Sequence, residues 1–291
     1  MMSDLHGDLA LLFPGQGVDP GETRDSVHDL RPDLYATAAK VCGADPFAHL
    51  AEGTSFAQPA IYCASLTIYE QMGRPAADAH AGHSLGEITA LVAAGAVDSL
   101  DGLRIVAERG RLMQEAGEAA GAGGMLAVGS DREAAIELAR RTGLVVANFN
   151  SPSQFVLSGP EDAIERALAD ARAERGLRVK RLPVAGAFHS PALEPAVEPF
   201  RALLDSIEFH PPAVPVYSGV TAEPFGDDPR ATLAESITSP VRWIEVMRAL
   251  HAAGARGFAD VGPGRVLARL VKRILDDETV ETLDPTRLQH V

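Results

Sequence analysis

Short apolar runs alternate with longer amphipathic segments along much of the chain. The run at 9–13 (Leu-Ala-Leu-Leu-Phe) predicts a buried strand that ends at Pro14 and Gly15, and further strands are expected near 77–81, 214–218 and 257–261. Helical patterns lie between these runs, at 59–72, 87–95, 101–116, 192–205, 230–235, 241–253 and 264–275. Strands that alternate with helices predict a parallel sheet with helices on its faces.

Two of the helix starts carry sequence signals. Pro59 suits the first position of the helix at 59–72, because its missing N–H has no partner there in any case. Asp98 and Ser99 are candidate caps for the helix at 101–116. The segment after Asp276 is charged, and we expect it to be loosely packed.

The middle of the chain has a different pattern. The glycine-rich segment 117–124 reads as a linker, and the segments after it predict a strand, a helix, two strands, a helix and a strand. In chain order these six elements are expected at 125–128, 131–142, 144–148, 154–158, 161–175 and 177–184. The order βαββαβ is that of a ferredoxin-like unit. We therefore expect a small ferredoxin-like domain at 124–189, inserted into a larger α/β domain formed by 1–123 and 190–291.

The composition is that of an ordinary soluble protein. Of 291 residues, 46% are hydrophobic and 23% charged, and no apolar run reaches the roughly 20 residues that span a bilayer. The N-terminus is acidic, which argues against a secretory leader. The only cysteines, Cys42 and Cys63, fit neither a disulfide framework nor a zinc site. These features predict a cytoplasmic, monomeric enzyme without a membrane anchor or a bound metal.

The net charge of −14 argues against nucleic acid as a partner. Basic residues are nevertheless dense in two segments, 172–181 and 265–273. They are Arg172, Arg175, Arg178, Lys180 and Arg181 in the first, and Arg265, Arg269, Lys272 and Arg273 in the second. Either cluster could be a solvated surface or a docking face for an acidic protein or a phosphate-bearing substrate. The sequence leaves both interpretations open.

The sequence Gly-His-Ser-Leu-Gly-Glu at 82–87 points to a nucleophile. Gly-x-Ser-x-Gly between a strand and a helix forms a sharp turn that exposes the serine hydroxyl. Glycines are needed because a Cβ on either side would collide with the neighbouring strand and helix. Ser84 would then lie at a helix N-terminus, where N–H groups favour developing negative charge.

A serine nucleophile needs a base, and nine histidines are available. His83 adjoins Ser84 in sequence, but consecutive residues at such a turn point in different directions. His189 follows Gly-Ala-Phe where the chain returns from the small domain to the large one, and clefts form at such junctions. His189 is therefore the candidate base. The others suit surface or structural positions: His6, His28, His49, His80, His210, His251 and His290.

Three further residues are ambiguous from local pattern alone. The glycine-flanked Gln16 could direct a backbone N–H at an oxyanion, together with the N–H of Leu85 directly after the serine, or it could belong to an ordinary Pro-Gly turn. Arg109 lies in a helix, where most arginines are solvated. No acidic residue between Ser84 and His189 stands out by its context, which disfavours a Ser-Asp-His triad.

Eight short motifs follow one another along the chain. They are Phe-Pro-Gly-Gln-Gly at 13–17, Gln-Pro-Ala at 58–60, Gly-His-Ser-Leu-Gly-Glu at 82–87, Arg-Gly-Arg-Leu-Met at 109–113, Asn-Ser-Pro-Ser-Gln at 150–154, Phe-His-Ser-Pro at 188–191, Ser-Pro-Val-Arg-Trp at 239–243 and Val-Gly-Pro-Gly at 261–264. In this order they resemble the malonyl-CoA:acyl-carrier-protein transacylases and the related acyltransferase domains of polyketide synthases, and the resemblance covers about residues 9 to 275. It implies an α/β-hydrolase-like domain with a ferredoxin-like insert.

The resemblance also implies roles for the candidate residues. Ser84 would attack an acyl-CoA thioester, and His189, oriented by the backbone carbonyl of Ser236, would take its proton. The N–H groups of Gln16 and Leu85 would hold the oxyanion. Arg109 would bind the free carboxylate of a malonyl-type group, a pairing that a guanidinium suits better than an ammonium. The acyl group would pass to the phosphopantetheine thiol of an acyl carrier protein, without any other cofactor.

Phe188 and the loop after Gly17 bear on the choice of substrate. In polyketide relatives a Phe before the histidine accompanies malonyl use and a Ser accompanies methylmalonyl use, although one methyl group discriminates by only about 1–3 kcal/mol. This chain has Gly-Ala-Phe-His where the polyketide pattern has His-Ala-Phe-His. It also has Val-Asp-Pro-Gly-Glu at 18–22, a departure from the family that leaves fatty-acid and polyketide pathways both open.

Two other functions remain possible at this point. The same scaffold could release acyl groups from carrier proteins or from CoA to water, as a thioester hydrolase. Alternatively, the chain could be a docking subunit for a carrier protein without catalytic activity. A covalent acyl adduct on Ser84 would exclude the docking subunit, and the fate of that acyl group would separate transfer from hydrolysis.

Overall fold

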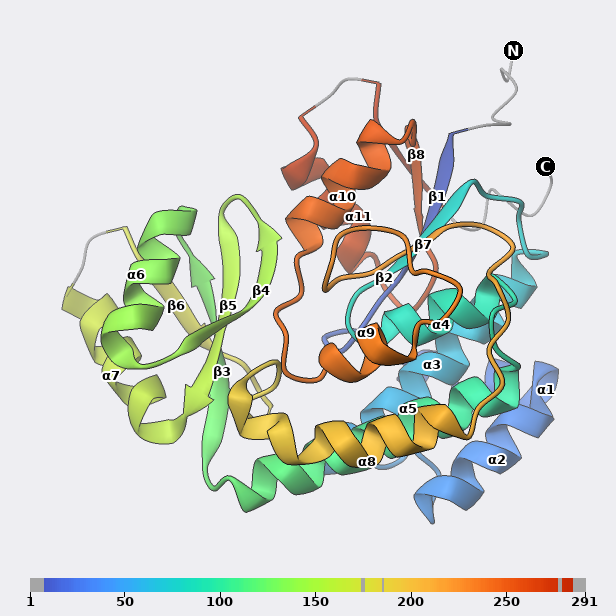
Figure 1. Ribbon diagram of the computed structural model, residues 1–291, viewed down its shortest axis with the longest axis horizontal. Coiled ribbons are helices and arrows are strands. Elements are labelled where there is room, and N and C mark those ends of the chain that lie inside the picture. Colours follow the sequence, from blue (N-terminus) through green and yellow to red (C-terminus); the bar gives the residue numbers. More distant parts are fainter. Residues whose placement is uncertain (1–7, 174–175, 185, 277–278, 285–291) are drawn as a thin grey trace.

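The computed structural model describes residues 8–173, 176–184, 186–276 and 279–284. Within them the chain forms a five-stranded parallel sheet and a separate four-stranded antiparallel sheet (Figure 1). The parallel sheet has the order β7-β2-β1-β8-β9. Its strands are β1 (Leu9–Phe13), β2 (Ala79–Gly82), β7 (Val216–Tyr217), β8 (Gly257–Asp260) and β9 (Glu281–Leu283). The predicted α/β class with a parallel sheet is confirmed.

Strand β1 shows why this sheet is covered on both faces. Leu9, Leu11 and Phe13 lie in one hydrophobic cluster, whereas Ala10 and Leu12 lie in another. Since successive side chains of a strand point to opposite faces, an uninterrupted apolar run belongs to a strand with helices on both sides. The first cluster contains the helices α3 (Thr54–Gln71), α4 (Gly86–Ala93) and α5 (Ser99–Ala119), and the second contains α10 (Trp243–Ala252) and α11 (Val266–Ile274).

The antiparallel sheet lies beside these layers, with strand order β4-β5-β3-β6 (Figure 1). It comprises β3 (Gly123–Gly129), α6 (Arg132–Thr142), β4 (Val145–Ser151), β5 (Gln154–Pro160), α7 (Glu161–Ala173) and β6 (Arg178–Arg181). The expected order of elements is therefore present. Strand β4 also bridges to the large part of the molecule, because Phe149 N–H donates to Val241 O and Val241 N–H donates to Ala147 O. These bonds hold the small sheet beside the segment that precedes α10.

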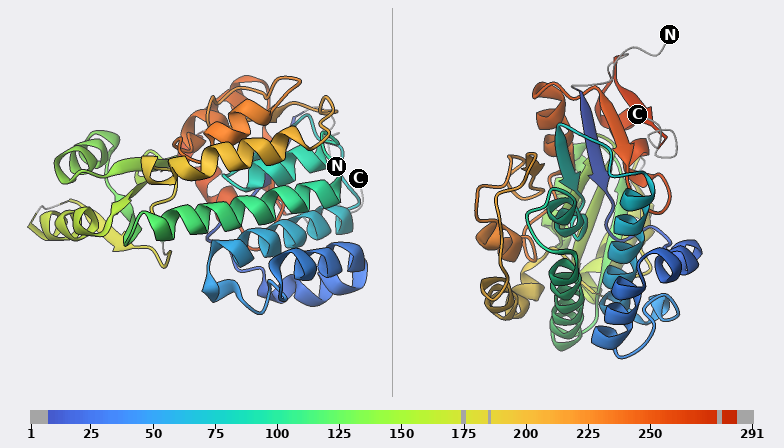
Figure 2. Two further views of the ribbon diagram at one scale, coloured as in Figure 1. Left: turned by 60° about the horizontal axis from the view of Figure 1, so that its bottom comes forward. Right: turned by 90° about the vertical axis from the view of Figure 1, so that its right-hand side faces the viewer.

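The remaining helices pack on α3, α5 and α8 (Glu194–Asp205). Helix α8 runs beside α5, and α9 (Arg230–Glu235) packs on α8 (Figure 2). Helices α1 (Arg24–Leu30) and α2 (Pro32–Cys42) flank α3 and were not predicted. Helix α2 begins with Pro32 and ends at Gly43, whose φ of 74° is the left-handed conformation typical of a helix end. The predicted cap at Asp98 is confirmed, since Asp98 accepts a hydrogen bond from Leu100 N–H at 2.7 Å at the start of α5.

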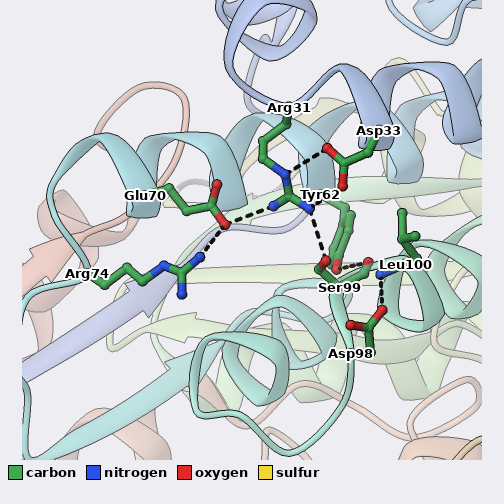
Figure 3. Close-up of polar contacts among 8 residues, drawn as sticks. All are labelled: Arg31, Asp33, Tyr62, Glu70, Arg74, Asp98, Ser99 and Leu100. Atoms are coloured by element: carbon green, nitrogen blue, oxygen red, sulfur yellow. Dashed lines mark hydrogen bonds and ion pairs between the residues drawn. The ribbon is translucent and has the colours of Figure 1, made fainter.

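Arg31, which lies between α1 and α2, joins three of these elements (Figure 3). Its guanidinium binds Asp33 and Glu70 at 2.8 Å each and donates to the Ser99 hydroxyl at 3.0 Å. Tyr62 donates its hydroxyl proton to Ser99 O at 2.7 Å in the same place. The start of α2, the end of α3 and the start of α5 are thus held together by one side chain.

Three predictions about elements were wrong. Helix α3 starts at Thr54, not at Pro59, which lies in its second turn. Because proline has no N–H, the carbonyl of Ser55 has no helical partner at residue 59 and accepts a hydrogen bond from the Cys42 thiol at 3.8 Å instead. The glycine-rich segment 117–124 is mostly the end of α5 and the start of β3, because Gly117 packs in the core. Within the charged segment after Asp276, which was expected to be loosely packed, Glu281–Leu283 form β9 and pair with β8, whereas 277–278 and 285–291 lie outside the described residues.

Candidate active site

The nucleophile turn connects β2 to α4. A Cβ on Gly82 would collide with the backbone of Gly86 and Glu87, and one on Gly86 would collide with Phe13 O in β1. Both glycines are therefore required by close backbone approach, as the sequence suggested. Between them Ser84 adopts a φ of 55°, in the left-handed region that residues with a side chain rarely occupy. Such backbone strain is common at functional sites.

His189 lies within hydrogen-bond distance of this serine. Its Nε2 is 2.9 Å from Ser84 Oγ, and its Nδ1 is 3.0 Å from both Ser236 O and Ser239 O. Because carbonyl oxygens only accept, Nδ1 must carry the proton and Nε2 is left as the acceptor for the serine hydroxyl. His189 also has a left-handed φ, 56°. Two carbonyl groups here occupy the place that a carboxylate has in a Ser-His-Asp triad.

The surroundings of His189 keep it neutral. The side chain is 5% exposed, and burial, helped by the charge of Arg109, lowers its pKa to about 3. A neutral imidazole at pH 7 can accept a proton, as a general base must. The arrangement of Ser84 and His189 can therefore activate the hydroxyl without a metal or a carboxylate.

Arg109 approaches the same serine from α5. Its side chain is 2% exposed, Nη2 is 3.2 Å from Ser84 Oγ and Nη1 donates to Gln58 Oε1 at 2.9 Å. Burial lowers the pKa of Arg109 to about 10, so the guanidinium stays charged at pH 7. No carboxylate of the described residues lies within ion-pair distance of it, and the Glu87 carboxyl opposes the lowering of its pKa only from further away. A buried cation of this kind favours an anionic ligand.

Gln16 and Leu85 lie next to the nucleophile, Gln16 in the loop after β1 and Leu85 directly after Ser84. A Cβ on Gly15 would collide with His83 O, so the loop after β1 lies directly against the nucleophile turn. The backbone N–H groups of Gln16 and Leu85 donate to no acceptor among the described residues. Two such groups beside a nucleophile suit the binding of an oxyanion.

The nucleophile and its base face a cavity of about 610 Å³ between the two sheets, whereas Arg109 is not among the residues that line it. Ser84, His189, Gln16 and Phe188 all line it, and the loop residues up to Pro20 form part of its wall. Phe188 is 6% exposed, and its ring lies where a Cβ on residue 186 would contact it at 2.8 Å. Gly186, the position that departs from the polyketide pattern, thus gives room for this ring.

Several residues of this site were not assigned a role from sequence. Ser239 shares the His189 Nδ1 proton with Ser236, and Gln58 holds Arg109, although both lie in motifs that the sequence displays. Asn150 Oδ1 binds His83 Nε2 at 2.9 Å, which ties the small sheet to the nucleophile turn. Glu87 is buried, accepts from Gly219 N–H at 2.5 Å and has its pKa raised to about 7 by burial. The one local signal that could have pointed to Gln58 and Glu87 as site residues is a polar side chain next to apolar neighbours.

The two basic clusters differ in position. Arg269 and Arg273 on α11 line a second cavity of about 270 Å³, which shares Gln16, His83 and Asn150 with the first. On the outer strand β6, Arg178 and Lys180 are exposed, and Arg181 pairs with Glu161 of α7. Arg175 lies outside the described residues. The basic residues at the mouth of the site are therefore those of α11.

Other site types find no support in the described ranges. They contain no group of three or more His, Cys, Asp or Glu side chains placed to bind a metal ion. None of the described helices combines the length and hydrophobicity that crossing a membrane requires. Cys42 and Cys63 are free thiols.

Comparison with known proteins agrees with this geometry. A family model for the acyl transferase domain matches residues 31–287. The malonyl CoA-acyl carrier protein transacylase of Escherichia coli K12 is 37% identical over 95% of this chain and 96% of its own length. The polyketide biosynthesis protein ThaF of Burkholderia thailandensis is 38% identical over 91% of this chain, which spans only 24% of that protein.

A solved structure of similar shape belongs to the same group. The malonyl-CoA:acyl carrier protein transacylase of Xanthomonas oryzae superposes with a TM-score of 0.85 at 34% identity, over 95% of this chain and 94% of that one. Both the sequence and the fold are shared over nearly the full length. The chain therefore belongs to the acyl transferase family, among the malonyl CoA-acyl carrier protein transacylases.

Proposed function

We propose that this protein transfers a malonyl group, or a related dicarboxylic acyl group, from CoA to the phosphopantetheine thiol of an acyl carrier protein. The observation that carries the proposal is the buried cation of Arg109 beside a Ser84–His189 pair. The serine and histidine supply acyl transfer, and the guanidinium supplies selection for an acyl group with a free carboxylate. Fatty-acid and polyketide biosynthesis are the pathways in which such a step would serve.

The mechanism has two half-reactions at one serine. In the first, His189 Nε2 takes the hydroxyl proton while Ser84 Oγ attacks the thioester carbonyl, and the N–H groups of Gln16 and Leu85 stabilise the oxyanion. CoA leaves as its thiol, taking the proton from His189. In the second, His189 removes the proton of the carrier thiol, which attacks the acyl serine and regenerates the Ser84 hydroxyl. Ser236 and Ser239 hold the imidazole in the required tautomer throughout.

The division of the fold belongs to the same proposal. We take 1–123 and 190–291 as an α/β-hydrolase-like domain and 124–189 as a ferredoxin-like domain, with the substrate bound between them. The antiparallel strand order β4-β5-β3-β6 and the strand-turn-helix at Ser84 support this assignment. Phe188 would fill the space beside the malonyl C2 atom and disfavour a methyl group there.

Transfer and hydrolysis are separated by following the acyl group. We expect malonyl-CoA to acylate Ser84, and addition of a phosphopantetheinylated carrier protein to convert the adduct into malonyl-carrier. The measurement compares free malonate with malonyl-carrier after one turnover, with Ser84→Ala as the control. Malonate release that is fast and indifferent to the carrier would instead identify a thioester hydrolase.

A further inference from the structure

A chain of hydrogen bonds connects Arg109 to the loop of Gln16 through the first turns of α3. Arg109 Nη1 donates to Gln58 Oε1 at 2.9 Å, and Gln58 Nε2 donates to Thr54 Oγ1 at 2.9 Å. The Thr54 hydroxyl donates in turn to Gln16 Oε1 at 3.2 Å. Since Arg109 Nη2 also reaches Ser84 Oγ, the chain links the cation beside the nucleophile to one of the two oxyanion donors.

The guanidinium fixes the direction of every bond in this chain. Arginine can only donate, so Gln58 must turn its oxygen toward Arg109 and its NH₂ toward Thr54. The Thr54 oxygen accepts that bond, which leaves its single proton for Gln16. Gln58 and Thr54 are 0% and 4% exposed, so water does not compete for these groups.

The backbone around Thr54 is held by α5, the helix that carries Arg109. The Thr54 carbonyl lies so close to α5 that a Cβ on Gly110 would approach its oxygen to 2.6 Å. Gln114, one turn further along, accepts from Ser55 N–H at 3.2 Å and from Ser55 Oγ at 2.9 Å. Thr54 is therefore fixed relative to Arg109. Among these hydrogen bonds, only the one from the Thr54 hydroxyl reaches the Gln16 side chain.

We propose that Thr54 is a positioning residue that determines specificity by coupling the carboxylate-binding Arg109 to the oxyanion loop at Gln16. The inference rests on the proposed function, because it assumes an acyl carboxylate on Arg109. Such a carboxylate fixes the guanidinium, and the chain then holds Gln16 in place while the thioester carbonyl is attacked. An acetyl group leaves Arg109 without that ligand, so its reaction gains less from Thr54.

Thr54→Val tests the coupling, because valine keeps the shape of threonine and removes its hydrogen bonds. The measurement is the single-turnover rate of Ser84 acylation by malonyl-CoA and by acetyl-CoA, followed by rapid quench and intact mass. We expect Thr54→Val to slow acylation by malonyl-CoA about tenfold, because the hydrogen bond that positions Gln16 is lost, and to slow acylation by acetyl-CoA less than about threefold. Thr54→Ser should restore the malonyl rate to within about twofold.

Ser55→Ala is the matched control. It removes a hydrogen bond from the same turn without touching the chain, so it should leave the malonyl-to-acetyl ratio unchanged, whatever it does to the melting temperature. An unchanged malonyl-to-acetyl ratio in Thr54→Val would overturn the inference, whether both acylation rates fall equally or neither changes. Failure of Thr54→Ser to restore the malonyl rate would overturn it too. A wild-type protein that forms no malonyl adduct would contradict the proposed function, and this inference with it.

Discussion

At the residue scale, the charge state of His189 makes a prediction about pH. Its pKa is lowered to about 3, whereas an imidazole of ordinary pKa would be only about 3% neutral at pH 5. We therefore expect the rate of Ser84 acylation to change by less than about twofold between pH 5 and pH 7 on account of His189. Stopped-flow acylation across this range, in buffers of equal ionic strength, measures it.

Glu87 requires a control in that experiment, because it is coupled to Arg109 and its pKa is raised to about 7. Glu87→Gln keeps an acceptor for Gly219 N–H and removes the titration. A fall of tenfold or more toward pH 5 in this variant, with a midpoint near 6.5, would show that His189 is not held neutral.

The same pKa has a consequence for stability. Between about pH 6.5 and pH 3 the unfolded chain binds a proton at His189 that the folded protein does not. This group therefore lowers the free energy of unfolding as the pH falls through that window. The cost is one reason why a buried histidine marks a functional site, where the neutral imidazole is needed.

At the scale of elements, the Arg31 contacts predict how the helices are held together (Figure 3). The Arg31 side chain is 14% exposed and binds α3 through Glu70. Arg31→Ala would leave Glu70 with only the exposed Arg74 as a partner. We expect a loss of about 1–3 kcal/mol in the free energy of unfolding. Urea unfolding measures it, and acylation per folded molecule should not change.

Arg24→Ala is the control for that prediction. Arg24 is more exposed and pairs with Asp45 at 2.8 Å, so its removal should lower the free energy of unfolding less than the removal of Arg31 does. A loss in Arg31→Ala no larger than in Arg24→Ala would mean that the contacts around Arg31 do not join the helices.

The elements also show how far the sequence alone could go. Strand β1 and the turn at Ser84 were predictable because an apolar run and closely packed glycines each have few structural solutions. Helices α1 and α2 were not, since their apolar positions are sparse and only Val27, Leu34 and Ala38 are buried in them. The start of α3 was missed because Pro59 reads as a first position, and only the contact with α5 shows otherwise.

The candidate site divides in the same way. Ser84 and His189 stand out by local motif and by their place at a junction of segments. Arg109 looks like any helix arginine, and only the resemblance to a family gave it a role. Gln58 and Ser239 lie in motifs that the sequence displays, but their partners Arg109 and His189 lie far away in the chain, as Gln16 does from Thr54, and only the fold shows these contacts.

At the scale of the whole molecule, the two basic clusters predict different effects on the carrier protein. Arg269 and Arg273 line the cavity beside the active site, whereas Arg178 and Lys180 lie on the outer strand of the small sheet. If the carrier protein docks beside the active site through acidic residues, charge reversal at Arg269 and Arg273 should slow transfer to it about tenfold or more at low salt, because local charge governs encounter. Reversal at Arg178 and Lys180 should slow it less.

Both variants are compared in the transfer half-reaction, from preformed acyl enzyme to carrier, at two salt concentrations. The salt dependence distinguishes an electrostatic effect from a folding defect. A larger effect from Arg178 and Lys180 would place the carrier on the small sheet instead.

The central claim is that Arg109 selects a dicarboxylic acyl group for Ser84. It is tested most directly by the acylation rates of Arg109→Ala with malonyl-CoA and acetyl-CoA, each read as the covalent adduct on Ser84. Loss of a charge-assisted pair should slow malonyl acylation by about 10- to 150-fold, while acetyl acylation is unchanged or faster. An unchanged malonyl-to-acetyl preference would contradict the account and remove Arg109 from the substrate site.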